Sequence, residues 1–362
     1  MTRVANFTAG PAALPLPVLE EAQRELTDYQ GTGMSIMENS HRSKTYEAVH
    51  NEAIALLKEL LGVPDGYQVL FLQGGASHQF AMLPLNLLPA GKSADYLITG
   101  HWSERAFDEA QLVGKARVAG TGKASGFMRI PTANELELDP SAAYVHITSN
   151  NTIYGTEYFA EPSTGGVPLV ADMSSDFLSR RLDVGKYGMI YAGAQKNIGP
   201  SGVLVAILRQ ELIDAGRKDI PTIFRYATHA KNNSLYNTPP TFAIYLVRGV
   251  LRWVKAQGGL AKIEAVNIDK ATRLYATLDD AGGYYRCPVD AASRSRMNVV
   301  WRLPSEALEE KFVKDSEKAG LVGLKGHRSV GGLRASIYNA VSIADVQKLC
   351  GFMDEFRAKN PA

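Results

Sequence analysis

The stretch YAGAQKNIGPSG, Tyr191–Gly202, is the most informative part of the chain for the fold, because it places a single lysine between two apolar runs. The run before it, YGMIYAG (187–193), and the run after it, GVLVAIL (202–208), are apolar at successive positions. That pattern is typical of strands buried on both faces of a mainly parallel sheet. Lys196 is the one charged residue in the stretch and lies among small residues. A surface lysine does not need such surroundings, whereas a lysine that forms covalent bonds does.

Further apolar runs extend this pattern over the first two thirds of the chain. Between them lie segments with the period of amphipathic helices, among them residues 15–29 and residues 45–63, and Gly62 and Pro64 stop the second of these. Alternating strands and helices predict an α/β fold with a mainly parallel central sheet. The other strands predicted in this region are residues 67–72, 94–99, 142–148 and 167–172.

The chain is long enough for two domains, because its 362 residues exceed the size that one hydrophobic core normally serves. The pattern of predicted strands and helices changes after residue 255. Near the C-terminal end, Ser342 and Asp345 are spaced like the capping pair of a helix. We predict a large domain over residues 16–255 and a smaller α+β domain over residues 256–362. The N-terminal segment, residues 1–15, belongs to the smaller domain. The strands predicted there are 296–303 and 331–339, and the helices are 305–320 and 342–359.

Composition excludes several classes of protein. Hydrophobic residues make up 45% and charged residues 21% of the chain, and the formal net charge is only +2, which argues against a nucleic acid or a membrane surface as the main partner. Cys287 and Cys350 share no short motif, so we expect neither a disulfide framework nor a metal site. The N-terminal residues lack the apolar run of a signal peptide. The expected location is the cytoplasm.

Two residues at predicted strand ends suggest a specific chemistry. The strand VPLVAD (167–172) ends in Asp172, at the kind of position where open α/β sheets bind ligands. Lys196 follows another strand end, so the two side chains can flank one flat cofactor. A lysine that binds an aldehyde and an aspartate that keeps a ring nitrogen protonated are the arrangement of pyridoxal phosphate enzymes. Each residue taken alone also fits a helix cap or a loop lysine.

Three further motifs are consistent with that cofactor. In QGGASHQF (73–80) a strand is followed by glycines and a helix start, which suits a phosphate. In GHWSERA (100–106), Trp102 could stack on an aromatic ring. In YNTPPTFAIY (236–245), Asn237 and Thr238 offer hydrogen-bond donors before a helix. A tight turn, a packing tryptophan and a helix cap are the alternatives for these motifs.

Clustered basic residues suggest a substrate with two anionic ends. They are His41 and Arg42 in NSHRSK, and His327, Arg328 and Arg334 in KGHRSVGGLRAS. Arginine binds carboxylate and phosphate through paired hydrogen bonds. Solvated surface arginine is the alternative for any one of them.

Together these segments resemble the phosphoserine aminotransferase family, which belongs to the class V, fold-type I pyridoxal phosphate enzymes. The resemblance covers essentially the whole chain, and AGAQKNIGP together with NTPPTF is its most specific part. The other segments that carry it are NFTAGPAALP, SHR, GGASHQF, ADMSSDFLSR, SRMNV and KGHRSVGGLRASIYNA.

The resemblance implies a role for each site residue. Lys196 binds the cofactor aldehyde and moves the substrate proton, and Asp172 pairs with the pyridinium nitrogen. Trp102 stacks on the ring, Thr152 binds its phenolic oxygen, and Ala76, Ser77 and Gln195 surround the cofactor phosphate. Asn237 and Thr238 of the partner subunit reach that phosphate, so the active unit is a homodimer. Arg334 binds the substrate α-carboxylate. His41 and Arg42 of the partner subunit, with His327 and Arg328, surround the substrate phosphate or the distal carboxylate of glutamate.

The implied reaction is reversible transamination between O-phospho-L-serine and 2-oxoglutarate in L-serine biosynthesis, with 4-phosphohydroxy-L-threonine of pyridoxine biosynthesis as an open second substrate. Some members have serine at the position of Ala9 and arginine at the position of Ser77, so those substrate contacts are absent or replaced here. An alanine–glyoxylate type aminotransferase, a cysteine desulfurase and a catalytically inactive scaffold are the alternatives. The desulfurase is disfavoured because Cys287 and Cys350 lie in the predicted small domain.

Overall fold

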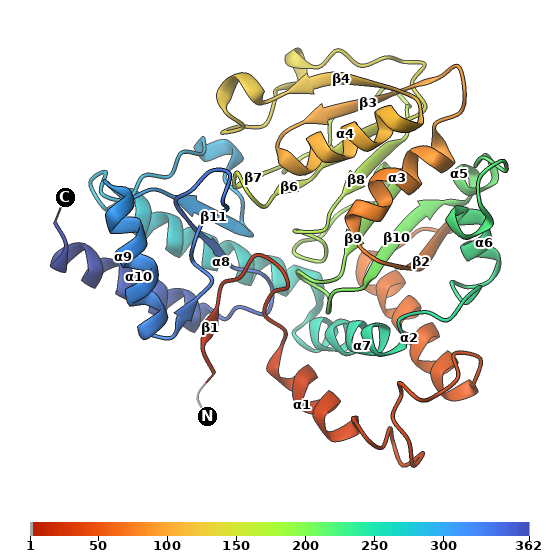
Figure 1. The fold of residues 1–362 in the computed structure, drawn as a ribbon, viewed down its shortest axis with the longest axis horizontal. Coiled ribbons are helices and arrows are strands. Elements are labelled where there is room, and N and C mark those ends of the chain that lie inside the picture. The colour runs from red at the N-terminus through yellow and green to blue at the C-terminus, as the bar shows by residue number, and fades with distance from the viewer. Residues whose placement is uncertain (1–2, 362) are drawn as a thin grey trace.

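The computed structural model describes residues 3–361 and is built around one seven-stranded sheet (Figure 1). The spatial order is β2-β10-β9-β8-β5-β3-β4, and β10 alone runs antiparallel to its two neighbours. The predicted α/β class and mainly parallel sheet are therefore confirmed. The strands in spatial order are β2 (Tyr67–Gln73), β10 (Val203–Arg209), β9 (Met189–Gly193), β8 (Leu169–Asp172), β5 (Val145–Thr148), β3 (Ser93–Ile98) and β4 (Lys115–Thr121).

Helices cover both faces of this sheet, which explains its continuous apolar strands. On one face, helices α3 (Ala76–Leu87) and α4 (His101–Val113) pack against residues such as Leu70 and Leu204. On the other face, α2 (Lys44–Leu61) and α7 (Thr241–Ala256) pack against residues such as Phe71. Alternate residues of one strand thus enter different hydrophobic clusters, and both clusters are buried.

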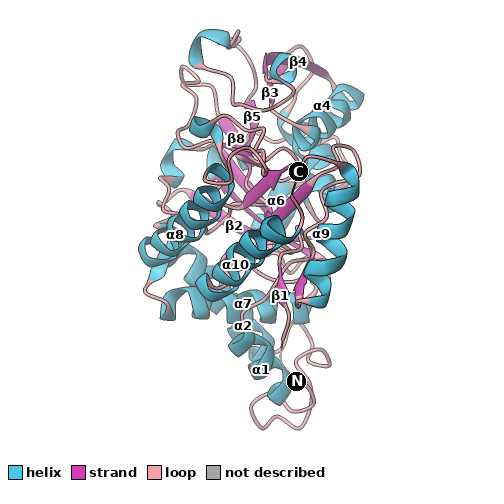
Figure 2. Ribbon diagram, turned by 90° about the vertical axis from the view of Figure 1, so that its left-hand side faces the viewer, coloured by secondary structure: helices cyan, strands magenta, loops and turns pink. Residues whose placement is uncertain are grey.

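A second, smaller set of elements faces the viewer in Figure 2 and has its own hydrophobic core. Helices α8 (Gly259–Asp279) and α10 (Ile343–Lys359) pack together beside the antiparallel pair β11 (Asn298–Trp301) and β13 (Leu333–Ser336). Helix α9 (Glu306–Lys318) also contributes to this core. The N-terminal strand β1 (Ala5–Asn6) pairs with β12 (Leu321–Val322), so the N-terminal segment packs within this smaller set of elements.

We propose the same domain division for the folded chain, on the basis of its packing. Ala5 and Phe7 belong to the smaller core, in line with the assignment of residues 1–15 to the small domain. Helix α8 joins both cores, because Leu260 packs in the large one and Leu274 in the small one. The boundary that we propose near residue 256 therefore lies just before a helix shared by the two parts.

Helix ends follow local capping chemistry. The Ser43 hydroxyl accepts the Tyr46 N–H at the start of α2, and Gly62 ends this helix in the left-handed conformation at φ +58°. The predicted capping pair at the start of α10 is confirmed, because Ser342 and Asp345 bond each other's backbone N–H groups. Such a cap stabilises a helix by about 1 kcal/mol.

The remaining elements are short. Helix α1 is shorter than its predicted range of 15–29, because the Tyr29 N–H donates to the Met34 carbonyl oxygen in a turn beyond the helix. Within residues 3–361, no helix is long and apolar enough to cross a bilayer. The other helices and strands are α1 (Leu16–Glu25), α5 (Gln210–Asp214), α6 (Tyr226–Lys231), β6 (Asn150–Asn151) and β7 (Thr156–Glu157).

Candidate active site

A cavity of about 450 Å³ opens at the edge of the sheet where the parallel strands end. The chain leaves β2 through Gly74, β5 at Thr148, and β8 at Asp172, and all three residues line this cavity. Open α/β sheets bind ligands at this edge, because the loops and helix N-termini there converge. Six of the residues singled out from the sequence line it together: Ala76, Ser77, Trp102, Asp172, Gln195 and Lys196.

Lys196 lies in the tight turn that joins β9 to the antiparallel strand β10. The Ile198 and Gly199 N–H groups both donate to the Ala194 carbonyl oxygen, which fixes the backbone around the lysine. The Lys196 amine donates to Thr152 Oγ1 at 2.9 Å. Burial lowers the pKa of Lys196 to about 8, although the Asp172 carboxylate acts in the opposite direction. Roughly a tenth of the side chain is therefore a neutral amine at pH 7, far more than for an exposed lysine.

Asp172 is 4% exposed and is held rigidly at the end of β8. Its Oδ1 accepts the Ser174 N–H at 2.9 Å and the Ser174 hydroxyl at 2.6 Å. The Ser174 Oγ also accepts the Gly193 N–H at 3.1 Å, which ties the ends of β8 and β9 together. Burial raises the pKa of Asp172, and the Ser174 bonds and Lys196 oppose this. Both bonds from Ser174 end on Oδ1, so Oδ2 stays available to a ligand in the cavity.

The start of α3 provides an anion-binding end to the cavity. Gly74 has a φ of +93°, and a Cβ there would lie 2.3 Å from His78 Nδ1, so only glycine fits. The Gly75 N–H donates to that same nitrogen at 3.4 Å. The turn brings the first residues of α3, Ala76 and Ser77, onto the cavity wall. The N–H groups of a first helical turn and the helix dipole favour a phosphate.

Unpaired polar atoms around the cavity fit a polar aromatic cofactor. Within residues 3–361, Trp102 Nε1 and Thr148 Oγ1 are buried without a hydrogen-bond partner, and both residues line the cavity. The Trp102 ring centroid lies 5.9 Å from Lys196 Nζ, so an indole face, an amine and a buried carboxylate surround one space. A cavity with an acid on one side, an amine on another and a helix N-terminus at one end suits pyridoxal phosphate.

Thr152 connects Lys196 to Arg334 of strand β13. The Arg334 guanidinium donates to the Thr152 carbonyl oxygen at 3.1 Å, while the Thr152 hydroxyl contacts Lys196. Arg334 Nε is buried without a partner among the described residues, and burial lowers the pKa of this side chain. Arg334 therefore offers a free donor close to the lysine.

The structure does not bring every predicted residue to this cavity within one chain. Asn237 lines a neighbouring cavity of about 540 Å³, on the other side of the α3 start. The Thr238 carbonyl oxygen accepts from Gln73 Nε2 at 2.6 Å, next to the end of β2. His41 and Arg42 precede α2, and His327 and Arg328 lie between β12 and β13. None of these six residues is among those that line the 450 Å³ cavity.

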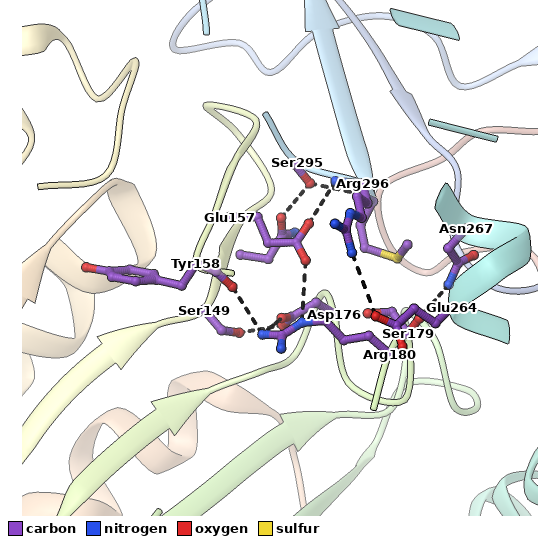
Figure 3. A network of polar contacts seen from close by, with 12 residues as sticks. Ser149, Glu157, Tyr158, Asp176, Ser179, Arg180, Glu264, Asn267, Ser295 and Arg296 are labelled. Carbon is purple, nitrogen blue, oxygen red and sulfur yellow. Dashed lines mark hydrogen bonds and ion pairs between the residues drawn. The ribbon is translucent and has the colours of Figure 1, made fainter. Parts of the chain in front are cut away.

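A buried polar network joins the two parts of the chain (Figure 3), and its Ser149 hydroxyl also donates to the Asp172 carbonyl oxygen. Asp176 accepts a short hydrogen bond from Ser149, and Arg180 lies 3.8 Å from Asp176 and 3.7 Å from Glu157. Glu157 in turn accepts the Arg296 N–H at 2.7 Å. Burial raises the pKa of both carboxyl groups, and repulsion from Asp176 adds to this effect at Glu157, as repulsion from Asp172 does at Asp176. The network fixes the β6–β7 hairpin, which carries Thr152.

Sequence reasoning missed the residues that support the site. The sequence does not single out Ser174, although a serine two positions after a strand-end aspartate indicates an Asx-type turn that could have revealed it. Asn197, next to Lys196, accepts the Asn339 N–H at 3.0 Å and thus links the lysine turn to the smaller core. No local pattern could have predicted this long-range contact.

Comparisons with known proteins agree with this geometry. The family model for class-V aminotransferases matches residues 4–349. A phosphoserine aminotransferase from Niallia circulans is 57% identical over 355 residues, which cover 98% of each chain.

Two solved structures share the fold over almost the full length. That of phosphoserine aminotransferase from Bacillus circulans subsp. alkalophilus has a TM-score of 0.97 at 56% identity and covers 99% of each chain. That of phosphoserine aminotransferase from Trichomonas vaginalis, described as bound to PLP, has a TM-score of 0.93 at 39% identity and covers 97% of this chain and 100% of that one. The chain therefore belongs to the class-V aminotransferases and, among them, to the phosphoserine aminotransferase family.

Proposed function

We propose that this protein catalyses reversible transamination between O-phospho-L-serine and 2-oxoglutarate, with pyridoxal phosphate as cofactor. The products are 3-phosphohydroxypyruvate and L-glutamate, which places the reaction in L-serine biosynthesis. The observation that carries the proposal is that Lys196 and Asp172 line one cavity together with the start of α3. The family membership of the whole chain supports the same reaction.

The residues on the cavity wall, together with Thr152 beside Lys196, fit the cofactor in a defined orientation. Lys196 would hold its aldehyde carbon, and the buried Asp172 would pair with its ring nitrogen. Trp102 would cover one face of the ring, and Thr152 would reach the phenolic oxygen. When bound, pyridoxal phosphate supplies the aldehyde that takes up an amino group and a ring that withdraws electrons from the substrate. Ala76, Ser77 and Gln195 would surround the phosphate.

The side chains of the site supply proton transfer, charge stabilisation and substrate binding. Lys196, which is partly neutral because of its lowered pKa, removes the α-proton of the amino acid and later returns a proton as a general acid. Asp172 stays ionised against a cationic ring nitrogen, because opposite charges in a buried site stabilise each other. Arg334 holds the substrate α-carboxylate beside Lys196. Thr152 contacts both Lys196 and Arg334, and these two hydrogen bonds fix the position of the amine relative to the guanidinium.

We also propose a homodimer with shared sites. Asn237 and Thr238 lie outside the cavity of their own chain, and the arginine-bearing loop before α2 does too. In a dimer, Asn237 and Thr238 of the partner subunit would complete the phosphate end, and His41 and Arg42 of the partner subunit would meet His327 and Arg328 around the distal anion of the substrate. The two cysteines are free thiols, which supports a cytoplasmic location.

A coupled assay tests the proposed reaction. Purified protein with pyridoxal phosphate is supplied with L-glutamate and 3-phosphohydroxypyruvate, and 2-oxoglutarate formation is followed. We expect turnover with this pair and little with L-alanine and glyoxylate. The Lys196→Ala variant should lose nearly all activity. A protein that stays colourless with pyridoxal phosphate would indicate an inactive scaffold, and a preference for glyoxylate would indicate the alanine–glyoxylate type.

A second comparison tests recognition of the phosphate group. Arg42→Ala should raise the KM for 3-phosphohydroxypyruvate more than the KM for an unphosphorylated analogue, because Arg42 is proposed to bind the phosphate. Equal losses for both substrates would contradict that role. The same assay with 4-phosphohydroxy-L-threonine shows whether the second phosphorylated substrate is also used.

A further inference from the structure

His101, the first residue of α4, lies between the proposed cofactor site and the basic loop of the smaller part. The centroid of its imidazole lies 5.1 Å from that of Trp102, which lines the cavity. On its other side, the centroid of the His327 ring lies 6.3 Å away, with the two ring planes inclined by 34°. His101 follows β3 directly through Thr99 and Gly100, so its backbone position is set by the sheet.

The His327 ring is held in one orientation. Its Nδ1 accepts the Ser329 N–H at 3.3 Å and lies 2.7 Å from the Ser329 hydroxyl. A nitrogen that accepts from a backbone N–H carries no proton, so in the neutral ring the proton is on Nε2. The His327 carbonyl oxygen also accepts the Val330 and Gly331 N–H groups, which fixes the loop. His327 thus offers a preorganised Nε2–H donor.

Positive charge gathers around this pair of imidazoles. Burial lowers the pKa of His327, and Arg334, His101 and Arg328 lower it further by repulsion. His101 of the large part and Arg328 and Arg334 of the smaller part therefore all lie close enough to His327 to act on it electrostatically. A dianion would relieve that repulsion more than a single negative charge would. A phosphate carries close to two negative charges at neutral pH, whereas a carboxylate carries one.

The geometry points to His101 as a further specificity-determining residue, which together with His327 binds the distal phosphate of the substrate and favours it over a distal carboxylate. The inference rests on the proposed function for the identity of the substrate. His101 acts by direct contact with the substrate and not through the cofactor.

Ligand binding tests this without any turnover. The dissociation constants of 3-phosphoglycerate and 2-oxoglutarate, which carry a distal phosphate and a distal carboxylate, are measured by calorimetry on protein loaded with pyridoxal phosphate. For His101→Ala we expect about tenfold weaker binding of 3-phosphoglycerate, the effect of one lost hydrogen bond to a charged group, and less than a twofold change for 2-oxoglutarate. His101→Gln, which keeps an N–H donor, should restore part of the loss.

Arg105→Gln on the same helix is the matched control. Arg105 is exposed and pairs with Glu109 at 3.9 Å, so this change should leave both dissociation constants within twofold. Equal weakening of both ligands by His101→Ala, or unchanged binding of 3-phosphoglycerate, would overturn the inference. Because binding is read separately from catalysis, a wild-type protein without transaminase activity would refute the proposed function alone, and the ratio of the two dissociation constants would still decide the role of His101.

Discussion

Lys196 Nζ and Thr152 Oγ1 are 2.9 Å apart, although the two residues are 44 positions apart in the sequence. The hydroxyl accepts from the amine and so favours the charged form of Lys196. Burial has the larger, opposite effect and keeps the pKa of Lys196 at about 8. The pKa of the proposed general base is therefore lowered by burial and raised by the Asp172 carboxylate, with the Thr152 hydrogen bond as a further contact that favours the charged amine.

Thr152→Val should lower the pKa of Lys196 further. The change keeps the shape of the side chain and removes the acceptor, and a hydrogen bond to a charged group is worth enough to move the midpoint by about one pH unit. The pH dependence of Lys196 acetylation in cofactor-free protein, followed by mass spectrometry of its peptide, measures this. Thr272→Val, at an exposed position of α8, should change nothing. An unchanged or raised midpoint would contradict the assigned hydrogen bond.

Asp172→Asn should abolish most turnover without weakening the fold. The asparagine oxygen can still accept both Ser174 bonds, but the negative charge opposite the ring nitrogen is lost, which costs roughly a hundredfold or more in rate. In thermal unfolding, the cofactor-free variant should be no less stable than wild type, because a buried charge is removed. Asp108→Asn, exposed on α4, is the control. Turnover within tenfold of wild type would contradict the role of Asp172.

Glu157→Gln should change how stability depends on pH. Burial raises the pKa of Glu157 in the folded protein above its ordinary value of 4.5, so the folded state binds more protons than the unfolded state. Its contribution is then complete below pH 4.5 and is lost as the pH rises through the raised pKa. The free energy of urea unfolding should therefore fall more steeply from about pH 5 to about pH 8 in wild type than in Glu157→Gln.

The exposed residue Glu137 provides the comparison for that experiment. Glu137→Gln should follow the wild-type pH profile. Parallel profiles for wild type and Glu157→Gln would show that Glu157 is ionised throughout this range. The network in Figure 3 would then hold two charged acids around Arg180, and the raised pKa of Glu157 would be wrong.

Lys270→Met should destabilise the smaller part of the protein. The buried Lys270 amine donates to the carbonyl oxygens of Ile337, Tyr338 and Val341 at 2.7–3.0 Å, directly after the strand that carries Arg334. Three carbonyl groups would lose their donor, at a total cost of about 3 kcal/mol. Lys262→Met, at an exposed position of the same helix, should stay within about 0.5 kcal/mol of wild type. Urea unfolding that shows equal effects for both variants would contradict this role.

The central strands could be predicted because burial on both faces leaves continuous apolar runs, as in β9 and β10. Strand β4 could not, because it lies at the edge of the sheet, where Lys115 and Val118 are exposed and the apolar pattern is lost. Helices α2 and α10 were predicted because a stripe of apolar residues and capping side chains mark them. Local chemistry thus reveals the elements that are either fully buried or clearly capped.

The residues of the site also fall into those that the sequence predicts and those that it does not. Asp172 and Lys196 could be predicted from strand ends and small neighbours, whereas Thr152 came from family resemblance alone. The buried contact between Glu157 and Arg296 joins residues 139 positions apart, so it depends on how the two parts pack and leaves no local pattern. No local sequence pattern marks His101 either, because its proposed role depends on how close its ring lies to that of His327 in the folded chain.

The decisive experiment for the proposed chemistry is to identify the residue that holds the cofactor. Purified protein is incubated with pyridoxal phosphate, reduced with borohydride, digested and examined by mass spectrometry. We predict that the pyridoxyl group is attached to Lys196, with loss of the visible absorbance in Lys196→Ala. Attachment to any other lysine, or an unlabelled protein, would contradict the role of Lys196.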